Sequence, residues 1–230
     1  MSESKMNFPK TIGIIGGTGK EGKGLAYRWA LAGIKIVIGS RQLEKAEGAA
    51  SEVNALLQSK NIVIGMVNQQ AAEIADLIVL TVPYAAHVSM CEMIRPYAIG
   101  KIVIDVTVPL VPPKVSRAQM PPEGSAARQA QLILGEDVQV VAAFQNISYE
   151  HLLNDEPVDC DVIVCGGNRE AREVVIGLVE AAGLVGWNGG PVENAMVVEG
   201  FTSILIGLNK QFSTSSAGIR ITGIPRKDES

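Results

Sequence analysis

A glycine-rich turn near the N-terminus has residues suited to binding a phosphate group. Residues 11–22 read Thr-Ile-Gly-Ile-Ile-Gly-Gly-Thr-Gly-Lys-Glu-Gly, in which Gly17, Gly19 and Gly22 form a GxGxxG pattern between a strand-like and a helix-like run. In this context Gly17 permits a tight turn, Gly19 lets the backbone approach a pyrophosphate, and Gly22 lets the helix pack on the strand. The helix N-terminus would also offer free N–H groups to the anion. The pattern therefore predicts a dinucleotide site.

The same residues come close to a second phosphate-binding pattern, the P-loop of NTPases. Gly17, Gly22 and Lys23 have the spacing of its glycines and lysine, and residues 102–105, Ile-Val-Ile-Asp, resemble its metal-binding strand. However, Gly24 stands where a P-loop needs Ser or Thr to bind magnesium. The dinucleotide interpretation is therefore favoured over the P-loop, and a glycine turn that serves only chain reversal is the other alternative.

The end of the next strand-like run predicts which dinucleotide is bound. NAD sites place Asp or Glu about 20 residues after the glycines, where it bonds the ribose 2′-hydroxyl. Here the sequence reads Gly39-Ser40-Arg41, with Lys45 four residues further on. A Ser hydroxyl and two cations suit a 2′-phosphate, which a carboxylate would repel. We therefore predict NADP rather than NAD, the alternative being that Arg41 is an ordinary exposed residue at a helix start.

The elements that must position these residues follow an α/β pattern. Short, continuously apolar runs alternate with helix-like segments, as is typical of parallel strands buried on both faces. We predict a Rossmann doubly wound parallel sheet in an NADP-binding domain of residues 1–150, interrupted by a Pro-rich lid or crossover loop at 109–124. The predicted strands are 11–16, 34–39, 62–66, 77–82, 101–106 and 138–143.

Residues 151–230 are predicted to form a small C-terminal α/β domain. Its pattern is a strand at 161–165, a helix at 169–182, a strand at 184–187 and a long apolar helix at 193–212. The apolar face of the last helix would fit either the core or a dimer interface. The polar end, 226–230, is expected to fray.

The composition excludes several classes of protein. Hydrophobic residues make up 47% and charged residues 19% of the 230 residues, and the net charge is −4 without a basic stripe, so a folded chain that binds no nucleic acid is expected. Cys91, Cys160 and Cys165 form neither a CxxC motif nor a Cys/His cluster, which predicts free thiols in the cytoplasm and no metal site. No apolar run is long enough for a membrane span.

The sequence offers little for acid–base catalysis. His87 and His151 are the only histidines. His87 follows a predicted strand and could contact a cofactor, or it could lie on a helix surface. Asp105 could polarise a ligand or cap the following turn. Hydride transfer between two cofactors needs their carbons held face to face and little from side chains, so no catalytic residue is predicted.

Several segments together resemble the NADPH-dependent coenzyme F-420 oxidoreductases. They are residues 16–24, Gly39-Ser-Arg with Lys45, and then 80–84, 108–111, 142–148, 164–167 and 218–223. The resemblance covers nearly the whole chain. It implies a homodimer that transfers hydride reversibly between NADPH and coenzyme F-420, an 8-hydroxy-5-deazaflavin. It also implies that the C-terminal domain completes the deazaflavin site.

The resemblance also implies which residues bind the cofactors. Residues 18–21 (Thr18, Gly19, Lys20, Glu21) would meet the pyrophosphate, and Ser40, Arg41 and Lys45 would hold the 2′-phosphate. The path from adenosine to nicotinamide would be flanked by Val82, Pro83 and Tyr84. Val108 and Ser148 would lie near the nicotinamide and the deazaflavin. Some archaeal members have His where Phe144 stands, so a polar contact to the deazaflavin could be missing here.

Two other functions fit an NADP site in this fold. The chain could reduce a small imine, ketone or flavin, although such substrates usually need a positioned proton donor. It could also be a non-enzymatic NADP sensor, because a fold does not establish a reaction.

Overall fold

The computed structural model describes residues 8–57, 62–153 and 158–226. All the strands predicted from the sequence are present, with small shifts at their ends. In chain order the elements are β1 (Thr11–Ile15), α1 (Lys20–Leu31), β2 (Lys35–Ser40), α2 (Leu43–Leu56), β3 (Val63–Val67), α3 (Asn68–Ile74), β4 (Leu77–Leu80), α4 (Tyr84–Ala98), β5 (Ile102–Asp105), α5 (Ala126–Leu134), β6 (Gln139–Ala142), the 3-10 helix η1 (Tyr149–His151), β7 (Asp161–Gly166), α6 (Arg169–Ala181), β8 (Val185–Gly190), the 3-10 helix η2 (Val192–Asn194) and α7 (Ala195–Phe212).

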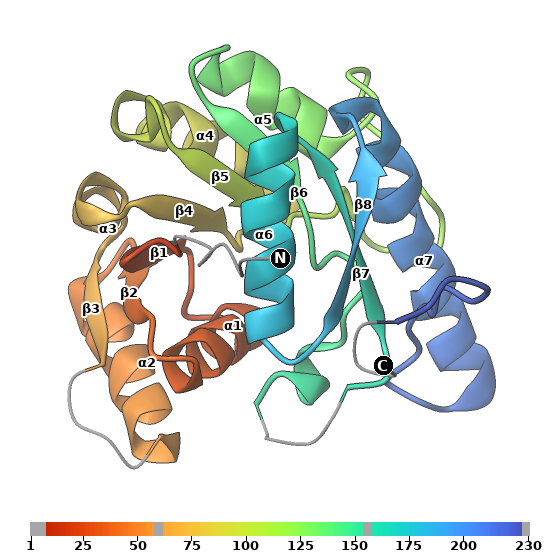
Figure 1. Ribbon diagram of the computed structural model, residues 1–230, viewed down its shortest axis with the longest axis horizontal. Helices are drawn as coiled ribbons and strands as arrows, with labels where there is room; N and C mark the ends of the chain where they lie inside the picture. Colours follow the sequence, from red (N-terminus) through yellow and green to blue (C-terminus); the bar gives the residue numbers. More distant parts are fainter. Residues whose placement is uncertain (1–7, 58–61, 154–157, 227–230) are drawn as a thin grey trace, which may run out of the picture.

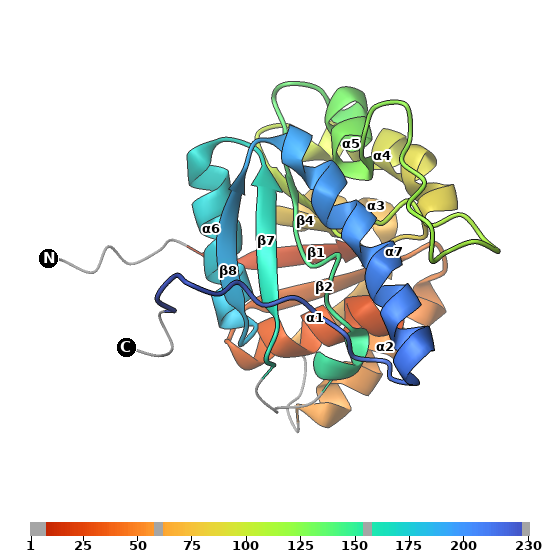
Figure 2. The ribbon, with the colours of Figure 1, turned by 90° about the vertical axis from the view of Figure 1, so that its right-hand side faces the viewer.

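The strands of the described chain form one eight-stranded sheet, with helices on both faces (Figures 1 and 2). Its order is β3-β2-β1-β4-β5-β6-β7-β8, and the first six strands are parallel. The order 3-2-1-4-5-6 is that of the Rossmann fold. The prediction of a doubly wound α/β fold is therefore confirmed.

The two predicted C-terminal strands extend this same sheet. β7 runs antiparallel to β6, and β8 runs parallel to β7. The predicted boundary at residue 150 thus falls close to the point where strand direction reverses. The sheet continues across that point, and the division into domains of 1–150 and 151–230 stays a prediction.

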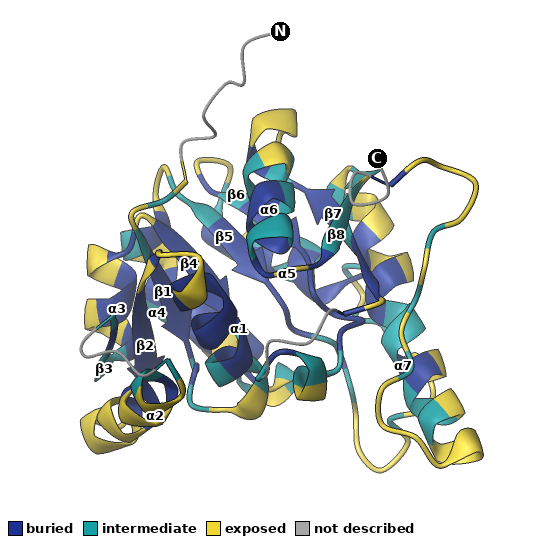
Figure 3. Ribbon diagram, turned by 60° about the horizontal axis from the view of Figure 1, so that its bottom comes forward, coloured by how far each residue is buried: buried dark blue, intermediate teal, exposed yellow. Residues whose placement is uncertain are grey.

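The apolar runs are buried because successive strand residues point into two cores, one on each face of the sheet. Ile12 and Ile14 of β1 pack with α1, α2 and α6, whereas Ile15 packs on the other face with α3 and α4. Figure 3 shows the strands as the most buried part of the molecule and the outer helix faces as exposed. Continuous apolar runs are what a sheet covered on both faces requires.

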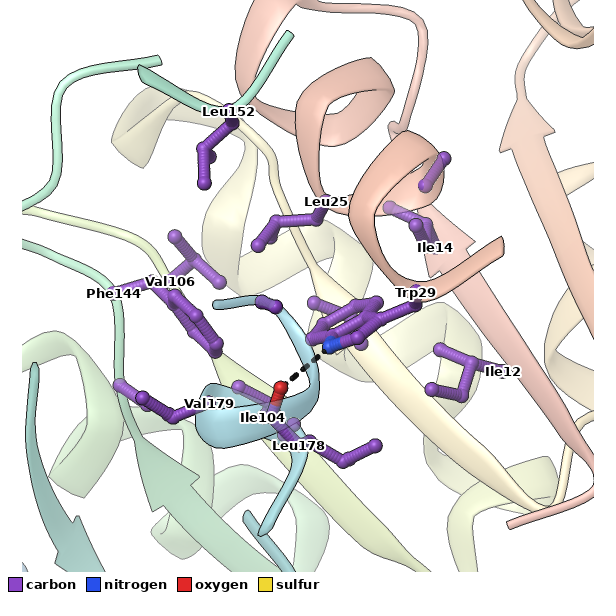
Figure 4. Close-up of a cluster of buried hydrophobic side chains, with 14 of the residues drawn as sticks. Ile12, Ile14, Leu25, Trp29, Ile104, Val106, Phe144, Leu152, Leu178 and Val179 are labelled. Atoms are coloured by element: carbon purple, nitrogen blue, oxygen red, sulfur yellow. Dashed lines mark hydrogen bonds between the residues drawn. The ribbon is translucent and has the colours of Figure 1, made fainter. Parts of the chain in front are cut away.

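Trp29 of α1 connects the N-terminal and C-terminal halves through the first of these cores. Its indole Nε1 donates a hydrogen bond to the Leu178 carbonyl of α6 at 2.8 Å (Figure 4). Its ring meets Phe144 edge to face, with centroids 5.7 Å apart. Phe144 is fully buried and has a φ of 72°. α1 and α6, which lie on either side of the predicted domain boundary at residue 150, therefore share one packed core.

The C-terminal segment 218–226 is anchored by a buried carboxylate. Asp161 accepts hydrogen bonds from the backbone N–H of Ile221 at 2.8 Å and from the Trp187 indole at 2.8 Å. Arg226 also pairs with it at 2.6 Å and is itself buried. The expectation that the chain frays from 226 is wrong at Arg226, because its charge is satisfied in the core. Residues 227–230 lie outside the described residues.

The Pro-rich segment lies along α7. A Cβ added at Gly200 would be 3.6 Å from Met120 Cε, and one at Gly207 would be 3.9 Å from Ser116 Cβ. The glycines of α7 therefore let residues 116–120 approach the helix. Among the described helices, none is long and apolar enough to cross a lipid bilayer.

Candidate functional site

A cleft of about 940 Å³ opens at the carboxyl ends of the parallel strands. It lies where the strand order reverses between β1 and β4, which is where open α/β sheets bind ligands. Its lining comes from the turn after β1, the end of β2, the β4–α4 turn, the loops after β5 and β6, and α7. Its volume is near the upper end of the range for small-molecule pockets, which suits an extended ligand or two ligands.

The glycine turn, residues 16–22, forms one end of the cleft floor. Its positive φ angle is at Gly16 (72°), so Gly16 makes the tight turn that was predicted for Gly17. Gly17 instead packs on Gly22, since a Cβ on Gly22 would lie 2.6 Å from Gly17 Cα. A Cβ on Gly19 would meet nothing within 4 Å, and Gly19 is the N-cap of α1 without a side-chain cap. The turn therefore presents bare backbone and open helix N–H groups to the cleft.

The remaining residues of this turn also reach the cleft. Thr18, Lys20 and Glu21, which the resemblance assigns to the pyrophosphate, line it. Lys20 Nζ donates to the Tyr149 hydroxyl at 3.2 Å and lies 4.6 Å from the centre of that ring. Asn68, which the sequence reasoning missed, also stabilises this turn. Its Oδ1 accepts a hydrogen bond from Gly16 N at 3.1 Å.

The polar residues after β2 lie at the same, outer end of the cleft as the glycine turn. Ser40, Arg41 and Lys45 all line it, and Arg41 and Lys45 are exposed to solvent. In the described parts of the chain, no carboxylate pairs with Arg41 or Lys45. Two cations without acidic partners, beside a serine hydroxyl, can hold a phosphate dianion.

The inner end of the cleft brings together most of the other predicted residues. Val82, Pro83, Tyr84 and Val108 line it. Ser148 does not, because its Oγ faces its own backbone and accepts from Glu150 N at the start of η1. Its neighbours Ile147 and Tyr149 line the cleft instead.

His87 lies neither in the cleft nor on the surface of α4. It is fully buried, and its Nε2 is 2.7 Å from Oδ2 of the equally buried Asp105. Burial alone would lower the pKa of His87, but the hydrogen bond and charge of Asp105 raise it to about 11. No sequence pattern indicates this pair, because its members belong to different elements. Oδ1 of Asp105 accepts from Thr107 N at 3.0 Å, so the predicted turn cap is present.

The P-loop alternative does not fit this geometry. Lys23, which would have to reach a nucleotide phosphate, is turned toward Glu52 of α2 and does not line the cleft. Asp105, which would have to face a magnesium ion, is bonded to His87. Neither residue is placed for phosphoryl transfer.

Two buried polar side chains at the inner end were missed by the sequence reasoning. Thr107 and Gln145 both line the cleft, yet Thr107 Oγ1 and Gln145 Oε1 have no hydrogen-bond partner in the described structure. Gln145 Nε2 donates to the Asp105 carbonyl at 2.7 Å, which turns Oε1 away from that contact. Buried oxygens without partners cost about 1 to 3 kcal/mol each, so they fit a ligand that supplies N–H or O–H groups.

The positions of Phe144 and Gln145 bear on the expectation of a missing polar contact to the deazaflavin. The positive φ of Phe144 ends the in-and-out alternation of β6 and sends its ring into the core against Trp29. The next residue, Gln145, therefore reaches the cleft with its amide. Phe144 itself is buried and does not line the cleft, and the expectation of a missing polar contact stays a prediction.

Fold and cleft together define a dinucleotide-binding Rossmann protein. The glycine turn at the reversal of strand order and the cations after β2 are the features of that class. Residues 11–109 match the family model described as NADP oxidoreductase, coenzyme F-420-dependent.

Comparisons over the whole chain narrow this class to a family. The chain is 41% identical to the F-420-dependent NADP reductase of Methanocaldococcus jannaschii over 221 residues, covering 93% of this chain and 98% of the relative. It is 42% identical to that of Methanothermobacter thermautotrophicus over 224 residues, covering 94% and 97%. The chain belongs to the family of F-420-dependent NADP reductases.

A solved structure agrees in fold. A protein from Arthrobacter sp. FB24, named as a candidate F-420-dependent NADP reductase, superposes with a TM-score of 0.79. The match covers 93% of this chain and 99% of that one, at 22% identity. At that identity the match supports the architecture and not the substrate.

Proposed function

We propose that this chain is an oxidoreductase that transfers hydride reversibly between NADP(H) and coenzyme F-420. The observation that carries this function is one continuous cleft with two chemically different ends. One end has the bare glycine turn and the cations after β2, and the other has apolar walls around two unpartnered oxygens. Such a cleft can hold a phosphate-rich dinucleotide and a second, flat ring system. The relatives are named F-420-dependent NADP reductases, which supports a deazaflavin as that ring system.

Different residues of the cleft would bind different parts of the dinucleotide. The glycine turn would hold the pyrophosphate, with Thr18, Lys20 and Glu21 beside it. We assign the 2′-phosphate to Ser40, Arg41 and Lys45, all of which line the outer end. When both cofactors are bound, NADPH supplies the hydride and the deazaflavin ring accepts it.

The inner end would align the two rings and keep water away. Val108, Leu110 and Ile147 contribute apolar surface, and Val82 and Pro83 of the β4–α4 turn add to it. Thr107 and Gln145 could fix a ring edge by hydrogen bonds to N–H or carbonyl groups. Holding the reacting carbons at about 3 to 3.5 Å is the main requirement of such a transfer.

We also propose that the enzyme is a homodimer in the cytoplasm. The face of α7 that points away from the sheet exposes Met196, Val197, Ile204, Leu208 and Phe212. A contiguous apolar helix face of this kind is typical of a subunit interface. All three cysteines are free, which suits a reducing compartment. Light scattering that gives the mass of one chain at micromolar concentration would contradict the dimer.

The direct test of the function is an anaerobic assay. Purified protein is mixed with oxidised coenzyme F-420 and NADPH, and the loss of the deazaflavin's visible absorbance is followed. Rapid bleaching with NADPH and slow bleaching with NADH is the expected result. NADPH binding without any bleaching would refute the deazaflavin assignment, and a screen of imines, ketones and flavins would then separate the small-substrate reductase from the sensor.

Glu21 should make NADPH binding depend on pH. Burial raises the pKa of its carboxyl to about 8, so the group is neutral at pH 7 and becomes negative as the pH rises through that value. A negative Glu21 would repel the neighbouring pyrophosphate, and we expect affinity to fall up to about tenfold per pH unit above the pKa. Glu21→Gln should bind NADPH with a flat profile across the same range. Titrations that show parallel profiles for both proteins would contradict this role.

A further inference from the structure

A buried ion pair lies directly behind the inner wall of the cleft. His87 of α4 and Asp105 at the end of β5 are both fully buried, with Nε2 and Oδ2 2.7 Å apart. Neither residue lines the cleft, and hydride transfer as described above uses neither. A buried ion pair is weak evidence for stability, because desolvation offsets most of its attraction. A contribution to stability therefore does not by itself explain this pair.

Asp105 is bonded to both of the cleft residues that have unpartnered oxygens. Its Oδ1 accepts from the backbone N–H of Thr107 at 3.0 Å, and its carbonyl accepts from Gln145 Nε2 at 2.7 Å. These contacts fix the turn that carries Thr107 Oγ1 and the rotation of the Gln145 amide. Thr202 of α7 bonds the Gln145 carbonyl from the other side at 2.8 Å. The carboxylate of Asp105 in turn is held by His87.

His87 connects this arrangement to Tyr84 in the first turn of α4. Its ring stacks on that of Tyr84, with centroids 6.1 Å apart and an angle of 29° between the planes. Its Nδ1 faces Gln129 Oε1 at 3.4 Å, and Gln129 Nε2 donates to Glu123 at 3.1 Å. The imidazole therefore lies between a cleft residue of the β4–α4 turn and the end of β5.

We propose that His87 and Asp105 are positioning residues for hydride transfer, holding Thr107 and Gln145 in the arrangement that orients the second ring system. This inference rests on the proposed function for its kinetic consequence. Among the described residues, no hydrogen bond or ion pair joins the pair to the glycine turn or to Ser40, Arg41 and Lys45, so its loss should affect the second substrate and spare NADPH binding. Misplacement by about 1 Å can cost on the order of 100-fold in rate.

The test compares His87→Ala, His87→Gln and Cys91→Ala. Cys91 Sγ lies 3.7 Å from His87 Nε2 in the same core, but it makes no bond to Asp105. Cys91→Ala therefore also removes side-chain volume beside His87. It leaves in place the hydrogen bonds that connect His87 through Asp105 to Thr107 and Gln145. We expect His87→Ala to lower kcat for coenzyme F-420 reduction about 10- to 100-fold with the Kd for NADPH within about twofold. His87→Gln, which keeps an N–H donor, should recover part of the loss, and Cys91→Ala should keep kcat.

A crystal structure of His87→Ala supplies a readout that does not depend on turnover. We expect the Thr107 and Gln145 side chains to move while the glycine turn stays in place. If both side chains keep their positions, or if Cys91→Ala loses as much kcat as His87→Ala, the proposal is wrong. Absence of coenzyme F-420 reduction by the unaltered protein would refute the proposed function instead, and the positions of Thr107 and Gln145 in the variant would still decide the positioning role.

Discussion

Gly19→Ala is expected to weaken NADPH binding by at least about 100-fold while the protein stays folded, because it adds a methyl group only where the ligand would lie. A Cβ at Gly19 meets nothing within 4 Å in the unliganded chain, and its φ of −73° and ψ of 169° are open to alanine. In the complex the same methyl would separate the backbone from the pyrophosphate. Calorimetric titration with NADPH measures the loss, and thermal unfolding checks the fold.

Gly48→Ala is the matched control for an added methyl. Gly48 lies in α2 on an exposed face, and a Cβ there also meets nothing within 4 Å. That variant should gain up to about 1 kcal/mol of stability, as a Gly-to-Ala change in a helix does, and bind NADPH normally. Near-normal NADPH affinity in Gly19→Ala would show that the pyrophosphate lies elsewhere.

Arg41→Ala should have the second large effect, on the choice between NADPH and NADH. A charged hydrogen bond contributes about 1.5 to 3 kcal/mol, so the ratio of kcat/KM for the two cofactors should fall about 10- to 100-fold. The loss should fall on NADPH, because NADH has no 2′-phosphate for the guanidinium to hold. Steady-state rates with each cofactor measure the ratio.

Arg95→Ala provides a control of equal charge. Arg95 is exposed in the last turn of α4 and does not line the cleft. Its replacement should leave the cofactor preference unchanged. If Arg41→Ala and Arg95→Ala lower the NADPH rate equally, the effect is one of net charge and the 2′-phosphate assignment is wrong.

The outer half of the site was accessible to sequence reasoning because its residues are consecutive. The glycine turn and the Ser40–Arg41 pair each follow directly on a strand, and the ends of neighbouring parallel strands must meet at one edge of the sheet. The strands themselves could be predicted because a sheet covered on both faces needs continuous apolar runs. Local pattern and tertiary position agree in this part of the chain.

The inner half could not be predicted because non-local contacts decide it. Gln145 faces the cleft only because Phe144 takes a positive φ, and no sequence pattern marks that residue as left-handed. His87 is buried because a carboxylate at the end of another strand neutralises it. Thr202 of α7 donates a hydrogen bond to the Gln145 carbonyl. This contact could not be predicted either, because the apolar residues of α7 fit a core or an interface equally well.

The hydrogen bond between the Trp29 indole and the Leu178 carbonyl bears on recombining this enzyme with its relatives. A crossover at residue 150 looks attractive because it leaves every residue of the glycine turn on one parent. It would, however, pair α1 of one parent with α6 of the other, and these two helices share a single core. A workable chimera must inherit Trp29, Phe144 and the surroundings of Leu178 together, so the natural unit of exchange is the complete eight-stranded sheet.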